Sequence, residues 1–152
     1  MEKSELPCGS WPSIIAPEMI TQSTIGFGTI VLDGDDTYWI ETRPQEGGRH
    51  VIVKRSSDGT ILDAIPARFN ARTTVHEYGG GAYTVVNGTI YFANYFDQQL
   101  YRQTSGEVPQ AITTRDGLRF AEPLVDASRN RLIAAPRNGP SYRNQQTENW
   151  RN

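Results

Sequence analysis

The sequence predicts an all-β fold, namely a partial β-propeller with two four-stranded antiparallel blades and the start of a third. Short stretches rich in β-branched and aromatic residues recur along the chain, and Gly, Asp, Asn or Pro bound each of them. These stretches fall into sets of four, and equivalent segments recur at intervals of 52 and 42 residues. A four-stranded repeat of this length is typical of propeller blades. Helical periodicity is confined to residues 16–22, where we expect one short helix.

The first expected blade spans about residues 25–65, with strands at 25–32, 37–42, 50–55 and 60–65. Each connection contains residues that favour turns, because Gly adopts positive φ at no steric cost and Asp, Asn and Ser bond their own backbone. The three connections are Asp33-Gly34-Asp35-Asp36, residues 44–48, and Ser56-Ser57-Asp58-Gly59. Four strands joined in this way form a meander.

The second expected blade spans about residues 81–113, with strands at 82–86, 89–94, 99–103 and 109–113. Asn87-Gly88 is the dipeptide preferred in type I′ hairpin turns, so the strands on either side of it should pair directly. A third set, residues 118–135, has only two strands, at 118–126 and 131–135. The segments 37–40, 89–92 and 131–134 occupy equivalent second-strand positions in the three sets.

The flanking segments differ from this repeat. Residues 1–24 form an N-terminal segment that contains the short helix, and residues 136–152 lose all alternation, so we expect that tail to be disordered. A propeller usually has about four to eight blades. Two and a half blades cannot close a ring, so we expect a fragment whose last blade edge is open to self-association.

Composition excludes several classes of function. The formal net charge of −2 leaves no basic stripe for nucleic acid, and no apolar run approaches the length of a membrane span. The single Cys8 cannot form a disulfide within the chain, which favours the cytoplasm. No cofactor is expected, because Gly26-Phe27-Gly28 lacks the third glycine of a dinucleotide site.

Catalytic and metal motifs are also lacking in the sequence. The string that comes nearest to a hydrolase nucleophile elbow, residues 139–143, ends in Arg143 where a glycine is required. No metal site is expected: His50 has no second ligand at zinc spacing and should be an exposed strand residue. Asp33, Asp35 and Asp36 fit a hairpin turn better than a calcium loop.

Several stretches resemble the N-terminal region of prolyl oligopeptidase-family serine peptidases, in the branch of acylaminoacyl peptidases and dipeptidyl aminopeptidases. The resemblance covers about residues 9–135 and ends there. Its motifs are residues 9–13, 32–39, 43–49, 72–83 and 99–102, of which Arg72-Thr73-Thr74-Val75-His76-Glu77-Tyr78-Gly79-Gly80-Gly81-Ala82-Tyr83 is the longest.

The resemblance implies a propeller of the WD40-like kind that precedes an α/β-hydrolase domain and restricts which peptides reach its active site. The hydrolase lies outside these residues, so we expect no catalysis by this chain alone and a peptide substrate only in an intact parent. Two alternatives stay open. One is a binding scaffold that completes its ring from several copies of the chain, and the other is a small β-sandwich whose repeat spacing is accidental.

The residues that could line a peptide path in such a parent are Arg72, His76 and Glu77. A structural role is the stronger interpretation: these side chains would satisfy polar groups near the propeller axis, while Gly79, Gly80 and Gly81 let the chain pass closely from one blade to the next. Adjacent strand residues face opposite sides, so His76 and Glu77 should not converge as an acid/base pair. Trp11 and Trp39 should be core or inter-blade packing residues, and ligand stacking is the alternative.

Overall fold

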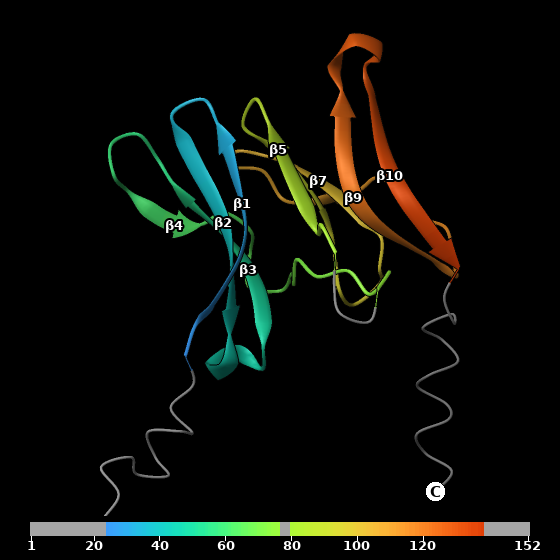
Figure 1. Ribbon diagram of the computed structural model, residues 1–152, viewed down its shortest axis with the longest axis horizontal. Coiled ribbons are helices and arrows are strands. Elements are labelled where there is room, and N and C mark those ends of the chain that lie inside the picture. The colour runs from blue at the N-terminus through green and yellow to red at the C-terminus, as the bar shows by residue number, and fades with distance from the viewer. Residues whose placement is uncertain (1–23, 77–79, 139–152) are drawn as a thin grey trace, which may run out of the picture.

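The computed structural model describes residues 24–76 and 80–138, and it consists of three antiparallel sheets placed side by side in chain order (Figure 1). The first hairpin of each sheet turns at the same end of the molecule, the upper end in Figure 1. Two sheets have four strands and the third has two. The predicted fold class, a partial β-propeller with the start of a third blade, is confirmed, and the successive meanders differ from the two face-packed sheets of a sandwich.

The first sheet has the strand order β1-β2-β3-β4. Its strands are β1 (Gly26–Asp33), β2 (Asp36–Arg43), β3 (Arg49–Arg55) and β4 (Ile61–Asp63), and the 3-10 helix η1 (Pro44–Glu46) joins β2 to β3. The expected turn glycines all take positive φ: Gly34, Gly47, Gly48 and Gly59. Each expected strand is therefore present, although β4 is shorter than the sequence predicted.

The second sheet repeats this order as β5-β6-β7-β8. Its strands are β5 (Tyr83–Val86), β6 (Thr89–Ala93), β7 (Leu100–Thr104) and β8 (Gln110–Ala111). Asn87 and Gly88 have φ values of 51° and 72°, and Val86 pairs with Thr89 across them. The predicted direct pairing across this dipeptide is confirmed.

The third sheet pairs β9 (Leu118–Asp126) with β10 (Arg131–Asn138) around the 3-10 helix η2 (Ala127–Arg129). The strand β10 continues through Asn138, so the expectation of disorder from residue 136 onward is wrong for its first three residues. Pro136 lies opposite Phe120 in this strand. An edge strand accommodates proline because its outward side needs no backbone donor.

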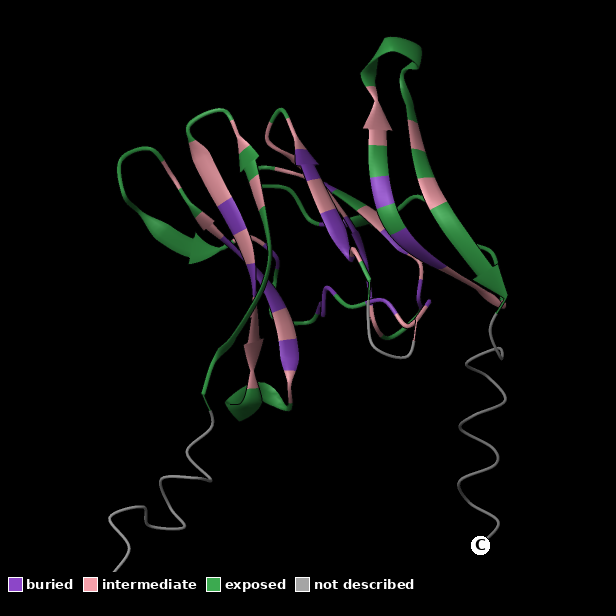
Figure 2. Ribbon diagram, in the orientation of Figure 1, coloured by how far each residue is buried: buried purple, intermediate pink, exposed green. Residues whose placement is uncertain are grey.

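The main core lies between the first two sheets. It joins apolar residues of β2 and β3 to residues of β5 and β6, and Val51, Ile52 and Phe92 in it are completely buried. A smaller cluster of Ala93, Leu100 and Phe120 joins the second sheet to the third. Figure 2 shows this burial in the central strands, with β4 and most of β1 exposed. The first strand of each sheet contacts the first strand of the next sheet, since β1 contacts β5 and β5 contacts β9. We call the edge that these three strands form the inner edge.

The outer flanks of the assembly carry exposed apolar side chains. In the first sheet Val31 packs against the core, so the alternate residues Ile30 and Leu32 face away from the second sheet, at 67% and 73% exposure. Phe27 is 76% exposed on the same strand. We call this surface the open face of the first sheet. Leu124 and Ile133, opposite each other in the third sheet, are also exposed.

Specific hydrogen bonds join the first sheet to the second. The Asp33 carboxylate accepts from the backbone N–H groups of Asn87 at 2.9 Å and Gly88 at 2.6 Å. The Tyr83 hydroxyl donates to the carbonyl of Thr29 at 3.0 Å, and burial raises the pKa of Tyr83. The two hairpin turns are thereby fixed to each other.

Several predictions concern residues outside the described ranges. They are the helix at 16–22, Cys8, Trp11, Glu77, Gly79 and the tail beyond Asn138. Within residues 24–76 and 80–138, no helix has the length and apolar character that a membrane crossing requires.

Candidate functional site

The candidate site is built on residues 70–76, which cross the lower end of the sheets in Figure 1 on the way from β4 to β5. We call these residues the crossing segment. Apart from an isolated bridge between Ala71 and Asn94, they belong to no strand. Their backbone groups are nevertheless hydrogen-bonded to all three sheets, as buried polar groups require.

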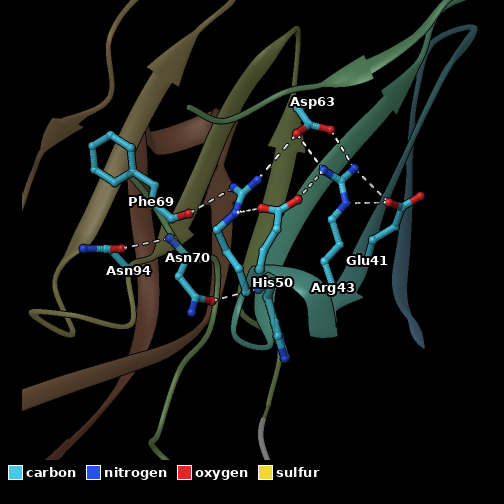
Figure 3. Close-up of polar contacts among 9 residues, drawn as sticks. Glu41, Arg43, His50, Asp63, Phe69, Asn70 and Asn94 are labelled. Atoms are coloured by element: carbon cyan, nitrogen blue, oxygen red, sulfur yellow. Dashed lines mark hydrogen bonds and ion pairs between the residues drawn. The ribbon is translucent and has the colours of Figure 1, made fainter. Parts of the chain in front are cut away.

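The first sheet holds the start of the crossing segment. The Asn70 side-chain oxygen accepts from the His50 N–H at 3.0 Å, and the Ala71 N–H donates to the His50 carbonyl at 2.9 Å (Figure 3). His50 is therefore half-buried, and the expectation of an exposed strand residue is wrong because the crossing segment lies against it. Burial lowers the pKa of His50, and the positive charge of Arg72 lowers it further.

The second sheet holds the middle of the crossing segment. The Asn94 side-chain oxygen accepts from the Asn70 N–H at 3.2 Å. The Gln98 side-chain oxygen accepts from both the N–H and the hydroxyl of Thr74, at 2.9 and 2.8 Å. Gln98 is buried and has a φ of 57°, an uncommon conformation for a residue other than glycine. The amide that bonds Thr74 is thus presented by a turn with a special backbone conformation.

The third sheet holds the end of the crossing segment. The Thr73 hydroxyl donates to the Phe120 carbonyl at 2.6 Å and accepts from the Val75 N–H at 3.2 Å. The Arg119 guanidinium donates to the Thr74 carbonyl at 3.1 Å, and the Arg137 guanidinium donates to the Val75 carbonyl at 2.7 Å. Two arginines of neighbouring strands therefore meet consecutive carbonyls of the crossing segment.

The glycines that follow also lie against the third sheet. The Gly81 carbonyl accepts from the Glu122 N–H at 2.6 Å, and a Cβ atom on Gly81 would lie 3.3 Å from the Cγ of Glu122. Glu122 has a φ of 54°, at the point where the β9–β10 register shifts. Gly81 thus permits a close backbone approach, and the surface approached is β9.

The predicted path residues lie at this site. Arg72 is exposed, and its guanidinium lies 5.2 Å from the centre of the Tyr95 ring, a cation–π arrangement. His76 is half-buried, and its Cδ2 atom would be 3.6 Å from a Cβ on Gly80, just before the inner strand β5. Arg72 and His76 therefore share the crossing segment. Sequence reasoning missed Gln98, Arg119 and Arg137, because nothing in the local pattern around them indicates such distant partners.

Trp39 lies elsewhere, on the first sheet beside a charged network. The Trp39 indole N–H donates to Glu41 at 3.1 Å. Arg43 bonds Glu41, Glu46 and Asp63 (Figure 3). Arg49, which is buried, bonds Glu46 and also donates to the Phe69 carbonyl at 3.3 Å. The hydrogen bond from Arg43 holds the pKa of Asp63 below its ordinary value. Every charge in this network has a partner, as in a structural cluster.

A cavity of about 590 Å³ separates the outer parts of the first two sheets. Tyr38, Lys54, Leu62 and Gln103 are among its lining residues. The Gln103 amide donates to the Ala64 carbonyl at 2.8 Å, and Lys54 forms an ion pair with Asp36 at 2.7 Å. In the described part of the chain, no three His, Cys, Asp or Glu side chains gather as metal ligands would.

Comparison with known proteins relates the whole arrangement to peptidases. A puromycin-hydrolyzing peptidase of Mycobacterium tuberculosis is 32% identical over 88% of this chain, with a TM-score of 0.77. A puromycin hydrolase is 31% identical over 86% of this chain, with a TM-score of 0.69. A mutant of puromycin hydrolase complexed with PGG is 31% identical over 80% of this chain, with a TM-score of 0.67. No family model and no curated protein matches the chain.

Each match covers only a small part of the larger protein. The chain spans 22%, 22% and 20% of the three solved structures, which is about a fifth of their length. Identity above 30% together with a shared fold goes beyond a likeness of architecture. The resemblance to prolyl oligopeptidase-family peptidases that the sequence motifs predicted is therefore confirmed, and this chain corresponds to one part of such a peptidase.

Proposed function

Since this chain is related to one part of the prolyl oligopeptidase-type serine peptidases, we propose that its blades belong to a propeller that controls which peptides reach a separate catalytic domain. In this proposal the chain supplies no catalytic residue. The crossing segment lines the peptide path, and Arg72 and His76 are the side chains that a passing peptide meets.

The position of the crossing segment is the observation that carries this proposal. Its residues lie at one end of the sheets and lead into β5, a strand of the inner edge. Hydrogen bonds from all three sheets hold it, through Asn94, Gln98 and Arg119 among others. A rigid polar segment beside the inner strands is suited to select peptides, because loops held by a rigid scaffold commonly carry binding residues.

A chimera tests the gating role. The blades of this chain replace the matching part of a puromycin-hydrolyzing peptidase, and kcat/KM is measured for an aminoacyl nitroanilide and for peptides of increasing length. We expect Arg72→Ala and His76→Ala to change the ratio of long to short peptides while nitroanilide hydrolysis is kept. Arg102→Ala, on an exposed position of β7, is the matched control. Unchanged length selectivity in both path variants would contradict the proposal.

Self-assembly is a second candidate, favoured by the exposed apolar side chains on both flanks. The two exposed apolar surfaces lie at opposite ends of the row of sheets: Phe27, Ile30 and Leu32 on the open face of the first sheet, and Ile133 on the third sheet. The first sheet of one copy could therefore pack against the third sheet of another, in a head-to-tail arrangement. Analytical ultracentrifugation of the purified chain tests this directly. A discrete oligomer that Leu32→Lys dissociates favours assembly, whereas a monomer at every concentration rules it out.

A cytoplasmic location is part of the same proposal. The single Cys8 supports it, since a chain with one cysteine needs no oxidising compartment for its own disulfides. Fractionation of cells that express the full gene tests this location, and recovery of the protein outside the cytoplasm would refute it.

A further inference from the structure

We propose that Arg119 and Arg137 form a binding site for the C-terminal carboxylate of a peptide at the end of the crossing segment. This inference rests on the proposed function and adds a substrate class to it. The site differs from the predicted path residues, since both arginines come from the third sheet, one from β9 and one from β10.

The strand register places the two arginines side by side. Arg119 and Arg137 are direct partners across the β9–β10 pair, so their side chains leave the same face of the sheet with Cβ atoms about 4.5–5.5 Å apart. Like charges directly opposite each other destabilise a sheet unless something compensates them. A bound anion between the two guanidinium groups would remove that cost.

The crossing segment fixes the direction of both guanidinium groups. The Nη1 atom of each arginine donates to a backbone carbonyl: that of Arg119 to Thr74 and that of Arg137 to Val75. A guanidinium has five N–H donors in a planar fork, so most donors of each arginine stay available to a ligand. Two oriented forks suit a planar carboxylate, which accepts paired hydrogen bonds from arginine.

The charge environment of this pair differs from that of the arginines that form ion pairs. Arg43, Arg49, Arg129 and Arg131 all form ion pairs with carboxylates. Within the described residues, neither Arg119 nor Arg137 has a carboxylate partner, although Arg131 on the same strand as Arg137 pairs with Asp126. A partly buried Arg119 beside a second cation therefore attracts an anionic group.

The experiment uses the full 152-residue chain and follows the arginine Nε–Hε resonances by NMR. The probes are N-acetyl-trialanine with a free carboxylate, the same peptide with a C-terminal amide, and inorganic phosphate. We expect the acid peptide to shift the resonances of both arginines, and Arg119→Gln or Arg137→Gln to weaken its binding at least about tenfold, the effect of losing a hydrogen bond to a charged group. Arg131→Gln is the matched control and should bind as the unchanged chain does.

Four results would overturn the assignment. Equal affinity for the amide peptide would exclude carboxylate recognition while leaving the peptide path intact, whereas equal affinity for phosphate would indicate a general anion site. Unchanged binding in a folded glutamine variant would exclude the arginines. If circular dichroism shows that the glutamine variants are unfolded, Arg119→Lys and Arg137→Lys replace them in the test. Lysine keeps the positive charge and a donor for the backbone carbonyl but lacks the planar fork of donors. Unchanged affinity of the lysine variants for the acid peptide would therefore contradict the proposal.

Discussion

Replacement of Thr73 by valine tests whether the crossing segment joins the sheets. Thr73 is 2% exposed, and its hydroxyl both donates to the Phe120 carbonyl and accepts from the Val75 N–H. Valine keeps the shape of the side chain but leaves those two backbone groups without this partner. An unsatisfied buried group costs about 1–3 kcal/mol, so we expect Thr73→Val to lower the free energy of unfolding by about 2–4 kcal/mol.

Urea denaturation followed by far-UV circular dichroism measures this loss. With a denaturant slope of about 1–3 kcal/mol per molar, the midpoint should fall by about 1–2 M. Thr84→Val is the control, since Thr84 is a half-buried residue of β5 whose hydroxyl bonds no described residue. The control should change stability by less than about 0.5 kcal/mol. If Thr73→Val costs no more than Thr84→Val, the crossing segment does not couple the sheets in the way described.

Three further predictions use the same assay. Asp33→Ala removes the acceptor for two N–H groups of the β5–β6 turn and should cost about 1–2 kcal/mol, whereas the exposed Asp35→Ala should be neutral. Phe92→Ala empties a completely buried core position and should cost about 3–5 kcal/mol, while Phe96→Ala, at 56% exposure, should cost less than about 0.5 kcal/mol. The pKa of Asp63 is below its ordinary value of 3.8 mainly because Arg43 bonds it, so its stabilisation is present above that value and is lost as the pH falls through the lowered pKa. Arg43→Met should flatten this acid-side loss in urea titrations at several pH values, and an unchanged pH profile would contradict the stated cause.

The hairpins could be predicted from the sequence because each depends on residues that are neighbours along the chain. Asn87-Gly88 has the positive φ values that its type I′ turn requires, and Val86 pairs with Thr89 as expected. The predicted repeat also agrees with the structure, since Trp39 and Tyr91 both lie in the second strand of their sheet. Local turn chemistry and a repeated pattern thus fix the strands and their grouping.

The candidate site could be predicted only in part, because its contacts join residues far apart in sequence. The longest motif contained Arg72 and His76, but the hydrogen bond from Thr73 to Phe120 spans 47 residues. His50 also changed environment, from an expected exposed strand residue to a half-buried one, because a segment 20 residues away bonds its backbone. No period or turn signal in the sequence carries such information.

The special backbone positions of the second and third sheets support one interpretation of the site. Gln98 and Glu122, both with positive φ, each bond the chain that runs through the crossing segment, Gln98 at Thr74 and Glu122 at Gly81. Conformations of this kind persist where the surrounding structure determines them, and they concentrate at functional sites. The geometry of the site therefore depends on how the three sheets sit together. A change that loosens Thr73 should also disturb Arg119, whereas a change in the Arg43 network, confined to the first sheet and its connections, should leave the candidate site in place.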